Sequence, residues 1–368
     1  MEVQFQNNSL LVSHQNKTFQ LHPIWLRERL PGEDFFDIDT NQRLYEPSSI
    51  NLDLQISHAE LLDALLKVEF NDGIKGTFNI DELLREMDSD KNKRGPLPER
   101  ILWNSELQNF PEAQFEEEMV EKESMYHLLM NFYKYGFVII KNVPTEDKYL
   151  LKFANSIGPV KVTNFGEYFD VKSKPNPNDL AYKPIALPPH TDNPYRKPAA
   201  PGIQFLHCLQ NEVSGGFSTL VDGFAVAEYL RNKHTEAFES LTTTNLRYQF
   251  QDKDIVLENW GELIELDKEG DYKQVRYSTR VDYVPPLEPE KLKNFYQARR
   301  LLSELYSSSE FELKFKLQPG DIMMFDNHRL LHGRTAYNAN EGMRHLQGCY
   351  LEFDATDGKL RHLARKFQ

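Results

Sequence analysis

The chain has 368 residues and a formal net charge of −13, and 40% of its residues are hydrophobic and 12% aromatic. This length and composition predict a globular protein of one or two domains with a sizeable core. The negative charge argues against nucleic acid or an anionic membrane as a partner, because both are bound by clustered lysine and arginine.

The cysteines and the amino terminus indicate a reducing compartment. Only two cysteines occur, Cys208 and Cys349, and each lies in an apolar stretch, so we expect reduced core residues and no disulfide. The first residues lack the order of a signal peptide, which is a basic segment followed by an apolar one. The longest apolar runs, such as residues 137–140, are much shorter than a membrane span. We therefore expect a cytoplasmic protein without a membrane partner.

Residues 1–90 are expected to form a small β-rich N-terminal domain. Short apolar pieces at residues 10–13 and 19–26 predict strands. Residues 58–68 predict an amphipathic helix, because leucines recur there at helical spacing.

A linker is predicted between this domain and the rest of the chain. Residues 88–101 are charged and contain Gly95 and two prolines, which is a composition typical of linkers. We place the linker at residues 91–105, so that residues 106–368 form the second domain.

The second domain is predicted to be mainly β, with helices packed outside. It opens with a helix at residues 116–136 and a buried strand at 137–143. Short strands separated by turns follow, and the last of them lie at 311–317, 321–325 and 344–353. Many short strands with few long helices favour a barrel or a sandwich.

One His-x-acid triplet in this domain is a candidate metal-binding pair. His190 and Asp192 lie within a stretch that has five prolines between residues 188 and 201, so the segment is not a helix interior. On an extended chain, side chains two apart point to the same side. The triplets at 58–60 and 234–236 lie in predicted helices, where side chains two apart do not face each other. A surface polar pair remains the alternative interpretation of His190 and Asp192.

A third ligand must come from a distant part of the chain. The segment 319–337 offers His328 and His332, after an apolar run at 322–325 that predicts a buried strand. Two histidines and one carboxylate are typical of non-haem Fe(II) oxygenases. Zinc bound by the same ligands is the main chemical alternative.

The order His-x-Asp, a long gap and His-x-Arg resembles that of the Fe(II)/2-oxoglutarate dioxygenases, in particular the γ-butyrobetaine and trimethyllysine dioxygenase branch. The resemblance covers nearly the whole chain. It is carried by the blocks LHPIWLRE at 21–28, YGFVIIKNVP at 135–144, PHTDNPY at 189–195, PGIQFLHCL at 201–209, GGFSTLVDGF at 215–224, FDNHRLLHGRTAY at 325–337 and RHLQGCY at 344–350. It implies a distorted double-stranded β-helix, or jelly roll, as the catalytic domain. It also implies a hydroxylase that uses Fe(II), with 2-oxoglutarate and O2 as co-substrates.

By this resemblance the iron ligands are His190, Asp192 and His332, which are also the catalytic residues. His328 falls where such enzymes often carry an aromatic residue, so we interpret it as structural. The family places an arginine for the distal carboxylate of 2-oxoglutarate at the position of Arg344, and arginine suits this task because its planar fork matches a carboxylate.

Further co-substrate and substrate contacts are implied by motif position. Ser218 and the backbone around Leu206 are expected to line the 2-oxoglutarate pocket. Members of the family hold a trimethylammonium cation in an aromatic cage by cation–π attraction. The positions that match the cage or lie beside it are Phe165, Phe169, Tyr182, Tyr350, Tyr195 and Asn193.

Three departures from the family pattern affect the expected cofactors and substrate. The segment after residues 25–27 contains no cysteine, so we predict no structural zinc. Asp179 and Arg280 align with two asparagines that hold the substrate carboxylate in γ-butyrobetaine enzymes, and the trimethyllysine enzymes have aspartate at the first position. Asp179 and Arg280 pairing with each other, or a shifted alignment, are the alternative interpretations.

The expected function is therefore hydroxylation of a short trimethylammonium zwitterion. The full charge of Arg280 tilts the expectation slightly to 2-(trimethylammonio)ethylphosphonate over γ-butyrobetaine, with γ-butyrobetaine or trimethyllysine hydroxylation as alternatives. A zinc-dependent hydrolase and a non-catalytic quaternary-amine binder are the alternatives from other classes. The resemblance also implies a homodimer.

Overall fold

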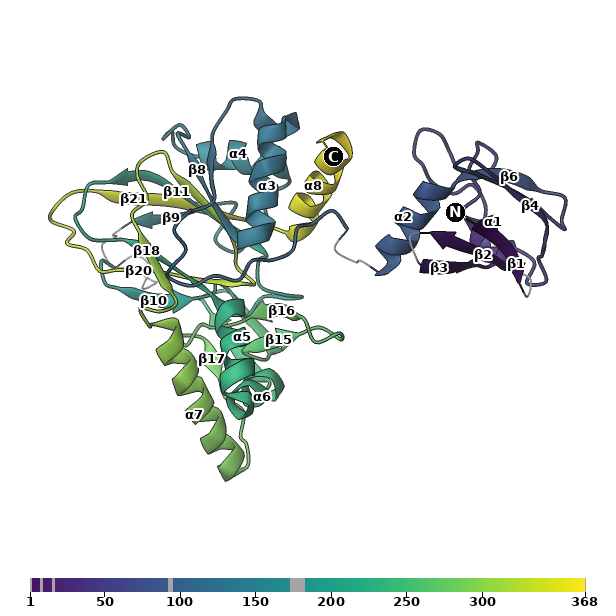
Figure 1. Cartoon of the computed structure of the whole chain (residues 1–368). Coiled ribbons are helices and arrows are strands. Elements are labelled where there is room, and N and C mark those ends of the chain that lie inside the picture. The colour runs from purple at the N-terminus through teal and green to yellow at the C-terminus, as the bar shows by residue number, and fades with distance from the viewer. Residues whose placement is uncertain (1, 7–8, 15–16, 92–94, 173–182, 368) are drawn as a thin grey trace. The chain divides into compact units, whose positions relative to one another are not determined.

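The computed structural model describes residues 2–6, 9–14, 17–91, 95–172 and 183–367. The chain divides into two compact units at Gly95 and Pro96 (Figure 1). None of the described helices combines the length and the apolar character needed to cross a bilayer.

The smaller unit contains two antiparallel three-stranded sheets and two helices. One sheet has the order β1-β2-β3 and the other β4-β5-β6. Their apolar faces share one buried cluster with Leu26 and Leu84 of the two helices. The bounds are β1 Glu2–Gln6, β2 Ser9–His14, β3 Lys17–Leu21, α1 Pro23–Glu28, β4 Ile56–Leu62, β5 Leu65–Phe70, β6 Lys75–Asn79 and α2 Ile80–Lys91, with a 3-10 turn at Pro47–Ser49.

The helix predicted at residues 58–68 is wrong, because this segment forms the β4–β5 hairpin. Asp63 lies in the turn with a positive φ of 55°. In β5, Leu66, Val68 and Phe70 are buried and alternate with exposed or half-buried residues. The leucine spacing fits a helix and a strand–turn–strand equally well, whereas this alternation fits only the strand.

The apolar piece at residues 19–26 is likewise not one strand. The strand β3 ends at Leu21, and α1 begins at Pro23, where the fixed φ of proline favours the first helical position. The His22 imidazole caps this helix by accepting a hydrogen bond from the Ile24 backbone N–H at 3.3 Å.

The larger unit is built around two facing sheets. The six-stranded sheet has the order β7-β8-β19-β11-β21-β9, and the four-stranded sheet has the order β10-β20-β12-β18. Leu206 and Met323 of the first sheet lie in one buried cluster with Leu220 and Leu330 of the second. The bounds are β7 Glu112–Gln114, β8 Phe137–Lys141, β9 Phe169–Lys172, β10 Leu187–His190, β11 Ile203–Asn211, β12 Ser218–Asp222, β18 Glu312–Phe315, β19 Ile322–Asp326, β20 Leu330–Arg334 and β21 Arg344–Leu351.

Helices cover the outer face of the six-stranded sheet (Figure 1). The predicted helix at residues 116–136 is shorter than expected, because a 3-10 turn at Met119–Glu121 precedes it. It ends at Gly136, whose φ of 81° glycine adopts without strain. The helices of this layer are α3 Glu123–Tyr135, α4 Tyr149–Ile157 and α8 Phe353–Phe367.

A third layer extends the unit beside the four-stranded sheet. A three-stranded sheet with the order β14-β13-β17 and the hairpin β15-β16 pack with three helices around a second buried cluster. The bounds are α5 Gly223–Lys233, α6 Thr235–Thr243, β13 Leu246–Gln251, β14 Val256–Gly261, β15 Ile264–Leu266, β16 Tyr272–Val275, β17 Asp282–Tyr283 and α7 Pro289–Tyr306.

Part of the predicted linker at residues 91–105 packs into the larger unit. Trp103 is 5% exposed, and its indole N–H donates to the Tyr135 carbonyl at 2.7 Å.

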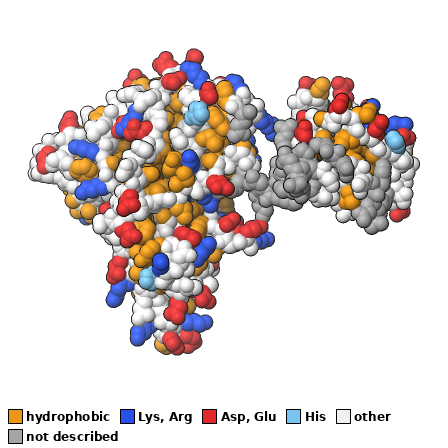
Figure 2. Space-filling model, in the orientation of Figure 1, with side chains coloured by type: hydrophobic (Ala, Val, Ile, Leu, Met, Phe, Trp, Pro, Cys, Tyr) orange, Lys and Arg blue, Asp and Glu red, His pale blue; other side chains and the backbone are white. Residues whose placement is uncertain are grey.

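On the face drawn in Figure 2, acidic and basic side chains of the larger unit are interspersed rather than gathered by sign.

Candidate metal centre

Strand pairing brings the two predicted histidine ligands together. His190 ends β10, His332 lies in the middle of β20, and the two residues are direct cross-strand partners. Opposite residues of an antiparallel pair place their side chains on the same face, and the two imidazole rings lie 4.3 Å apart between centroids. No strand was predicted at Leu330–Arg334, where the structure has β20.

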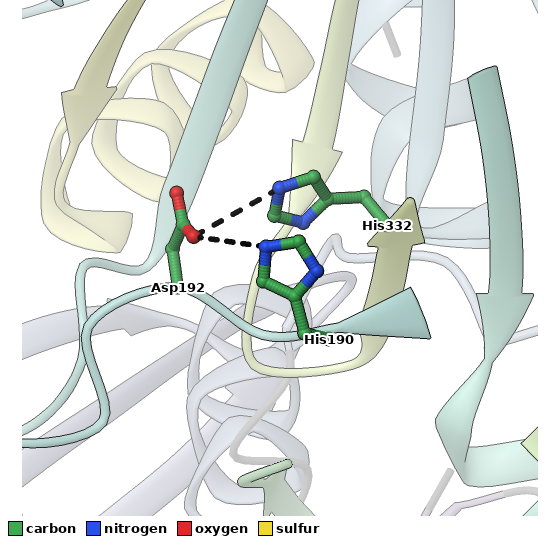
Figure 3. A group of neighbouring side chains, drawn as sticks. All are labelled: His190, Asp192 and His332. Carbon is green, nitrogen blue, oxygen red and sulfur yellow. Dashed lines mark ion pairs between the residues drawn. The ribbon is translucent and has the colours of Figure 1, made fainter. Parts of the chain in front are cut away.

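Asp192 completes a three-residue group with these histidines (Figure 3). Its Oδ1 atom lies 3.6 Å from His190 Nε2 and 3.9 Å from His332 Nε2. Within the described ranges, this is the only group of three or more histidine, cysteine or acidic residues whose ligand atoms lie close enough to hold one metal ion.

Hydrogen bonds fix the orientation of the ligand-bearing segment. The Nδ1 atom of His190 lies 2.9 Å from the Pro188 carbonyl, so it carries the proton and leaves Nε2 free to bind a metal. The Asn327 side chain accepts from the Asp192 backbone N–H at 2.8 Å and donates to the Asp192 carbonyl at 3.1 Å. The DNH turn that follows β19 therefore positions a ligand that lies more than a hundred residues away.

The protonation states suit metal binding. Burial and the neighbouring His190 together lower the pKa of His332 to about 3, although Asp192 opposes this shift, so the imidazole is neutral near pH 7. Burial alone would raise the pKa of the Asp192 carboxyl, but His332, His190 and the Tyr350 hydroxyl together hold this pKa well below its usual range. Metal ligands must be deprotonated to bind, and these residues meet that condition.

The group opens onto a cavity of about 410 Å³. All predicted site residues that the structure describes contribute to its lining. They are His190, Asp192, His332, Arg344, Ser218, Leu206, Phe165, Phe169, Asn193, Tyr195, Arg280 and Tyr350. The predicted Asp179 and Tyr182 lie outside the described residues.

Arg344 offers an unsatisfied cation to this cavity. It is 5% exposed, and its Nε donates to the Gly216 carbonyl at 3.3 Å. Its Nη1 is buried and has no hydrogen-bond partner among the described residues. A Cβ atom at Gly216 would lie 2.8 Å from the Arg344 Nε atom, so the glycine makes room for the guanidinium. A buried guanidinium nitrogen without a partner suits the binding of an anion.

Aromatic rings form much of the remaining wall. Phe169 and Tyr350 lie 5.2 Å apart between centroids. Phe250, which sequence reasoning missed, lies 5.0 Å from Tyr195 and 5.7 Å from Phe165. The ring faces of such residues attract a cation such as trimethylammonium.

Five polar lining residues were also missed, namely Gln204, Gln251, Asp252, Ser278 and Arg334. Gln204 is 1% exposed in β11, and its side-chain oxygen has no partner within the part of the chain described. A glutamine inside the apolar run PGIQFLHCL, on the same strand face as Leu206, was a usable signal. Asp252 is exposed, follows β13 directly and had no sequence signal, because it belongs to the third layer.

His328 lies apart from the metal-binding group. Its Nε2 atom is 2.7 Å from the Ala200 carbonyl, and its ring contacts Phe353. This geometry agrees with the interpretation of His328 as structural.

Comparisons with known proteins show a clear family resemblance. Residues 95–350 match the family described as taurine catabolism dioxygenase TauD, TfdA family. The chain is 30% identical to human γ-butyrobetaine dioxygenase, covering 95% of this chain and 92% of that protein. It is 29% identical to the γ-butyrobetaine dioxygenase of Pseudomonas sp. strain AK-1, covering 94% and 90% of the two chains. It is also 29% identical to the mitochondrial trimethyllysine dioxygenase of Bos taurus, covering 93% and 82%.

The fold of the larger unit also resembles that of a solved structure. The crystal structure of AAD-2 in complex with Mn(II) and N-oxalylglycine superposes with a TM-score of 0.52 at 16% identity, covering 68% of this chain and 97% of that one. This likeness concerns the fold, and the predicted double-stranded β-helix is confirmed.

Proposed function

Because the chain belongs to the TauD/TfdA dioxygenase family and is a 2-oxoglutarate-dependent dioxygenase, we propose that His190, Asp192 and His332 bind the Fe(II) that hydroxylates a trimethylammonium substrate. The observation that carries this proposal is the convergence of these three side chains on one cavity with Arg344 and an aromatic wall.

The residues present fit both Fe(II) and 2-oxoglutarate. Two imidazoles and one carboxylate form the donor set of non-haem Fe(II) oxygenases. The buried Nη1 of Arg344 has no hydrogen-bond partner among the described residues and suits the distal carboxylate of the co-substrate, and Ser218 lines the same cavity. When bound, these groups supply the oxidising chemistry that inserts one oxygen atom of O2 into a C–H bond while 2-oxoglutarate becomes succinate and CO2.

The aromatic wall holds the cationic end of the substrate. Phe169 and Tyr350 line the cavity as one pair, and Phe165, Tyr195 and Phe250 line it as a second group. Cation–π attraction to these faces binds trimethylammonium without a hydrogen bond. Placing the substrate by its ends presents one C–H bond to the metal, and a displacement near 1 Å costs roughly a hundredfold in rate.

The charged residues near the solvent bind the other end of the substrate. Arg280 and Asp252 are exposed and line the same cavity, so its outer part carries charges of both signs. Arg280 suits an anion. The preference for a phosphonate, drawn from Arg280 alone, is not supported, because the relatives are named for γ-butyrobetaine and trimethyllysine. Asp252 also disfavours a dianionic group at this place.

Trimethyllysine is favoured among these substrates by Asp252. The α-amino-acid end of trimethyllysine carries an ammonium beside a carboxylate, and Asp252 and Arg280 offer the complementary charges. The carboxylate end of γ-butyrobetaine would use Arg280 alone.

The proposal is tested by succinate formation with Fe(II), 2-oxoglutarate and air. Trimethyllysine, γ-butyrobetaine and 2-(trimethylammonio)ethylphosphonate are supplied separately, and hydroxylated product is measured by mass spectrometry. We expect one of the first two to stimulate succinate formation and to be hydroxylated in a one-to-one ratio with succinate. Equal succinate formation with and without all three substrates, in an enzyme loaded with iron, would contradict the assignment of the substrate class.

A further inference from the structure

Tyr350 joins the aromatic wall to the metal-binding carboxylate. Its ring lines the cavity beside Phe169, and its hydroxyl donates a hydrogen bond to Asp192 Oδ2 at 2.7 Å. We propose that Tyr350 is a positioning residue for the metal: its hydroxyl holds Oδ2 so that only Oδ1 of Asp192 faces the metal. This inference rests on the proposed metal site.

The two oxygens of Asp192 have separate surroundings. Oδ1 is the atom that lies 3.6 Å and 3.9 Å from the Nε2 atoms of His190 and His332. Oδ2 is the atom that accepts from Tyr350. A carboxylate that is free to rotate would offer either oxygen, or both, to an ion. The hydroxyl selects one of them.

Tyr350 is well placed for this task because its own position is fixed. It lies in β21 directly opposite Gln204 of β11 and is 4% exposed. Its carbonyl accepts from the Lys161 backbone N–H at 2.8 Å. The backbone that carries the ring is therefore held in the sheet.

The segment around Asp192 is held from two further sides. Asn327 bonds to the backbone of Asp192 at both its N–H and its carbonyl. The Tyr195 hydroxyl donates to Asn193 Oδ1 at 2.5 Å, next to Asp192 in the chain. The backbone of Asp192 is therefore fixed without Tyr350, and the hydroxyl of Tyr350 controls the remaining freedom, which is the rotation of the carboxylate.

The consequence is an open coordination sphere. Fe(II) held by the two histidines and by one oxygen of Asp192 would keep more ligand positions for the co-substrate and O2 than Fe(II) held by both oxygens of the carboxylate. Groups that orient metal ligands typically contribute a factor of roughly 10–100 to metal affinity.

The test separates the hydroxyl from the ring. Tyr350→Phe keeps an aromatic face for the substrate and removes the hydrogen bond to Asp192. Anaerobic binding of Mn(II) to the full chain is followed by electron paramagnetic resonance, so the readout does not depend on turnover. We expect the Kd for Mn(II) to rise roughly 10–100-fold and the spectrum of the bound ion to change.

Tyr133→Phe is the matched control. The Tyr133 hydroxyl makes a 2.8 Å hydrogen bond to the Thr356 hydroxyl among the outer helices, away from the metal-binding group. Removal of the Tyr133 hydroxyl should leave the affinity for Mn(II) unchanged. The melting temperature of Tyr133→Phe should be similar to that of Tyr350→Phe. Wild-type Mn(II) affinity and an unchanged spectrum in Tyr350→Phe would overturn the inference. Failure of the wild-type chain to bind Mn(II) would overturn the metal assignment itself, and with it the inference.

Discussion

At the scale of single residues, the site depends on which side chains face one another across strands. His190 and Asp192 were recognisable from their spacing on an extended segment, and His332 and Arg344 from their motif positions. Phe250 and Asp252 were not, because β13 reaches the cavity only through the packing of the third layer. Sequence spacing identifies neighbours on one element, whereas cavity walls bring together distant elements.

Arg280 and Asp252 are predicted to set the substrate preference. Replacing Arg280 with Asn removes a charged hydrogen-bond donor. We therefore expect the KM of each substrate with a carboxylate end to rise roughly 10–100-fold. Asp252→Asn should raise the KM of trimethyllysine only, because γ-butyrobetaine has no second ammonium. Steady-state kinetics on both substrates measures this. Parallel changes for the two substrates in Asp252→Asn would contradict the assignment.

His207 is predicted to make stability sensitive to acid. It is 0% exposed, neither ring nitrogen has a partner among the described residues, and burial lowers its pKa to about 4. The unfolded chain, with a histidine pKa of about 6.5, therefore takes up the proton first, and stability is lost as pH falls from about 6.5 towards 4. Between pH 7 and pH 5 this residue should cost about 2 kcal/mol.

Urea unfolding of wild type and His207→Phe at the two pH values checks this expectation. The variant should lose about 2 kcal/mol less than wild type over the same interval, since the other titrating groups are common to both. Equal losses in the two proteins would show that His207 is not the responsible group.

At the scale of elements, one buried ion pair ties the metal-bearing strand to its surroundings. Arg329 and Asp222 are 1% and 0% exposed at their side chains, and their closest atoms lie 2.6 Å apart. Asp222 also caps α5 through the Phe224 backbone N–H, and Arg329 donates to the carbonyls of Ile101 and Lys134. The pair therefore connects α5, the end of α3 and the start of β20.

Breaking this pair should destabilise the larger unit. We expect Asp222→Ala to lower the free energy of unfolding by about 3–5 kcal/mol, because it leaves a buried guanidinium without its partner. Adding Arg329→Met should restore part of this loss, since no unpaired charge then remains. Denaturant unfolding of the two variants provides the measurement. A loss below about 1 kcal/mol in the single variant would contradict the account.

Elements were predictable where periodicity was unambiguous. The strand predicted at 344–353 appears as β21 and the one at 321–325 as β19, because both are buried runs bounded by turns. The β4–β5 hairpin was mistaken for a helix, since its leucine spacing satisfies both periods. The strand β20 has the sequence LLHGR, with only two apolar residues at its start, so it shows no apolar run although it carries His332.

At the scale of the whole molecule, the site belongs to one of the two units, and the other unit is held together by packing. All described site residues lie in the larger unit. In the smaller unit, Arg27 is 9% exposed, its guanidinium lies 4.8 Å from the Phe35 ring centroid, and its Nε is 3.6 Å from Asp72. Packing and this cation–π contact hold the segment that follows α1.

The smaller unit is therefore predicted to need no zinc. Exhaustive dialysis against a chelator should leave the circular dichroism and the melting of this unit unchanged, because a buried apolar cluster holds it together. Elemental analysis before dialysis should find no more than one transition-metal ion per chain. A second tightly bound ion whose removal unfolds the smaller unit would contradict this prediction.

The homodimer implied by the family stays a prediction, and light scattering of the full chain tests it.

The central claim is that His190, Asp192 and His332 hold Fe(II) beside the Arg344 pocket for 2-oxoglutarate. The most direct measurement is an anaerobic titration of the metal-free chain with Fe(II) and 2-oxoglutarate, followed by the visible absorption of the complex. We predict a new absorption band that saturates at one Fe(II) per chain, is lost in Asp192→Ala, and needs a higher 2-oxoglutarate concentration in Arg344→Met. A band of equal strength and equal 2-oxoglutarate dependence in all three proteins would contradict the account.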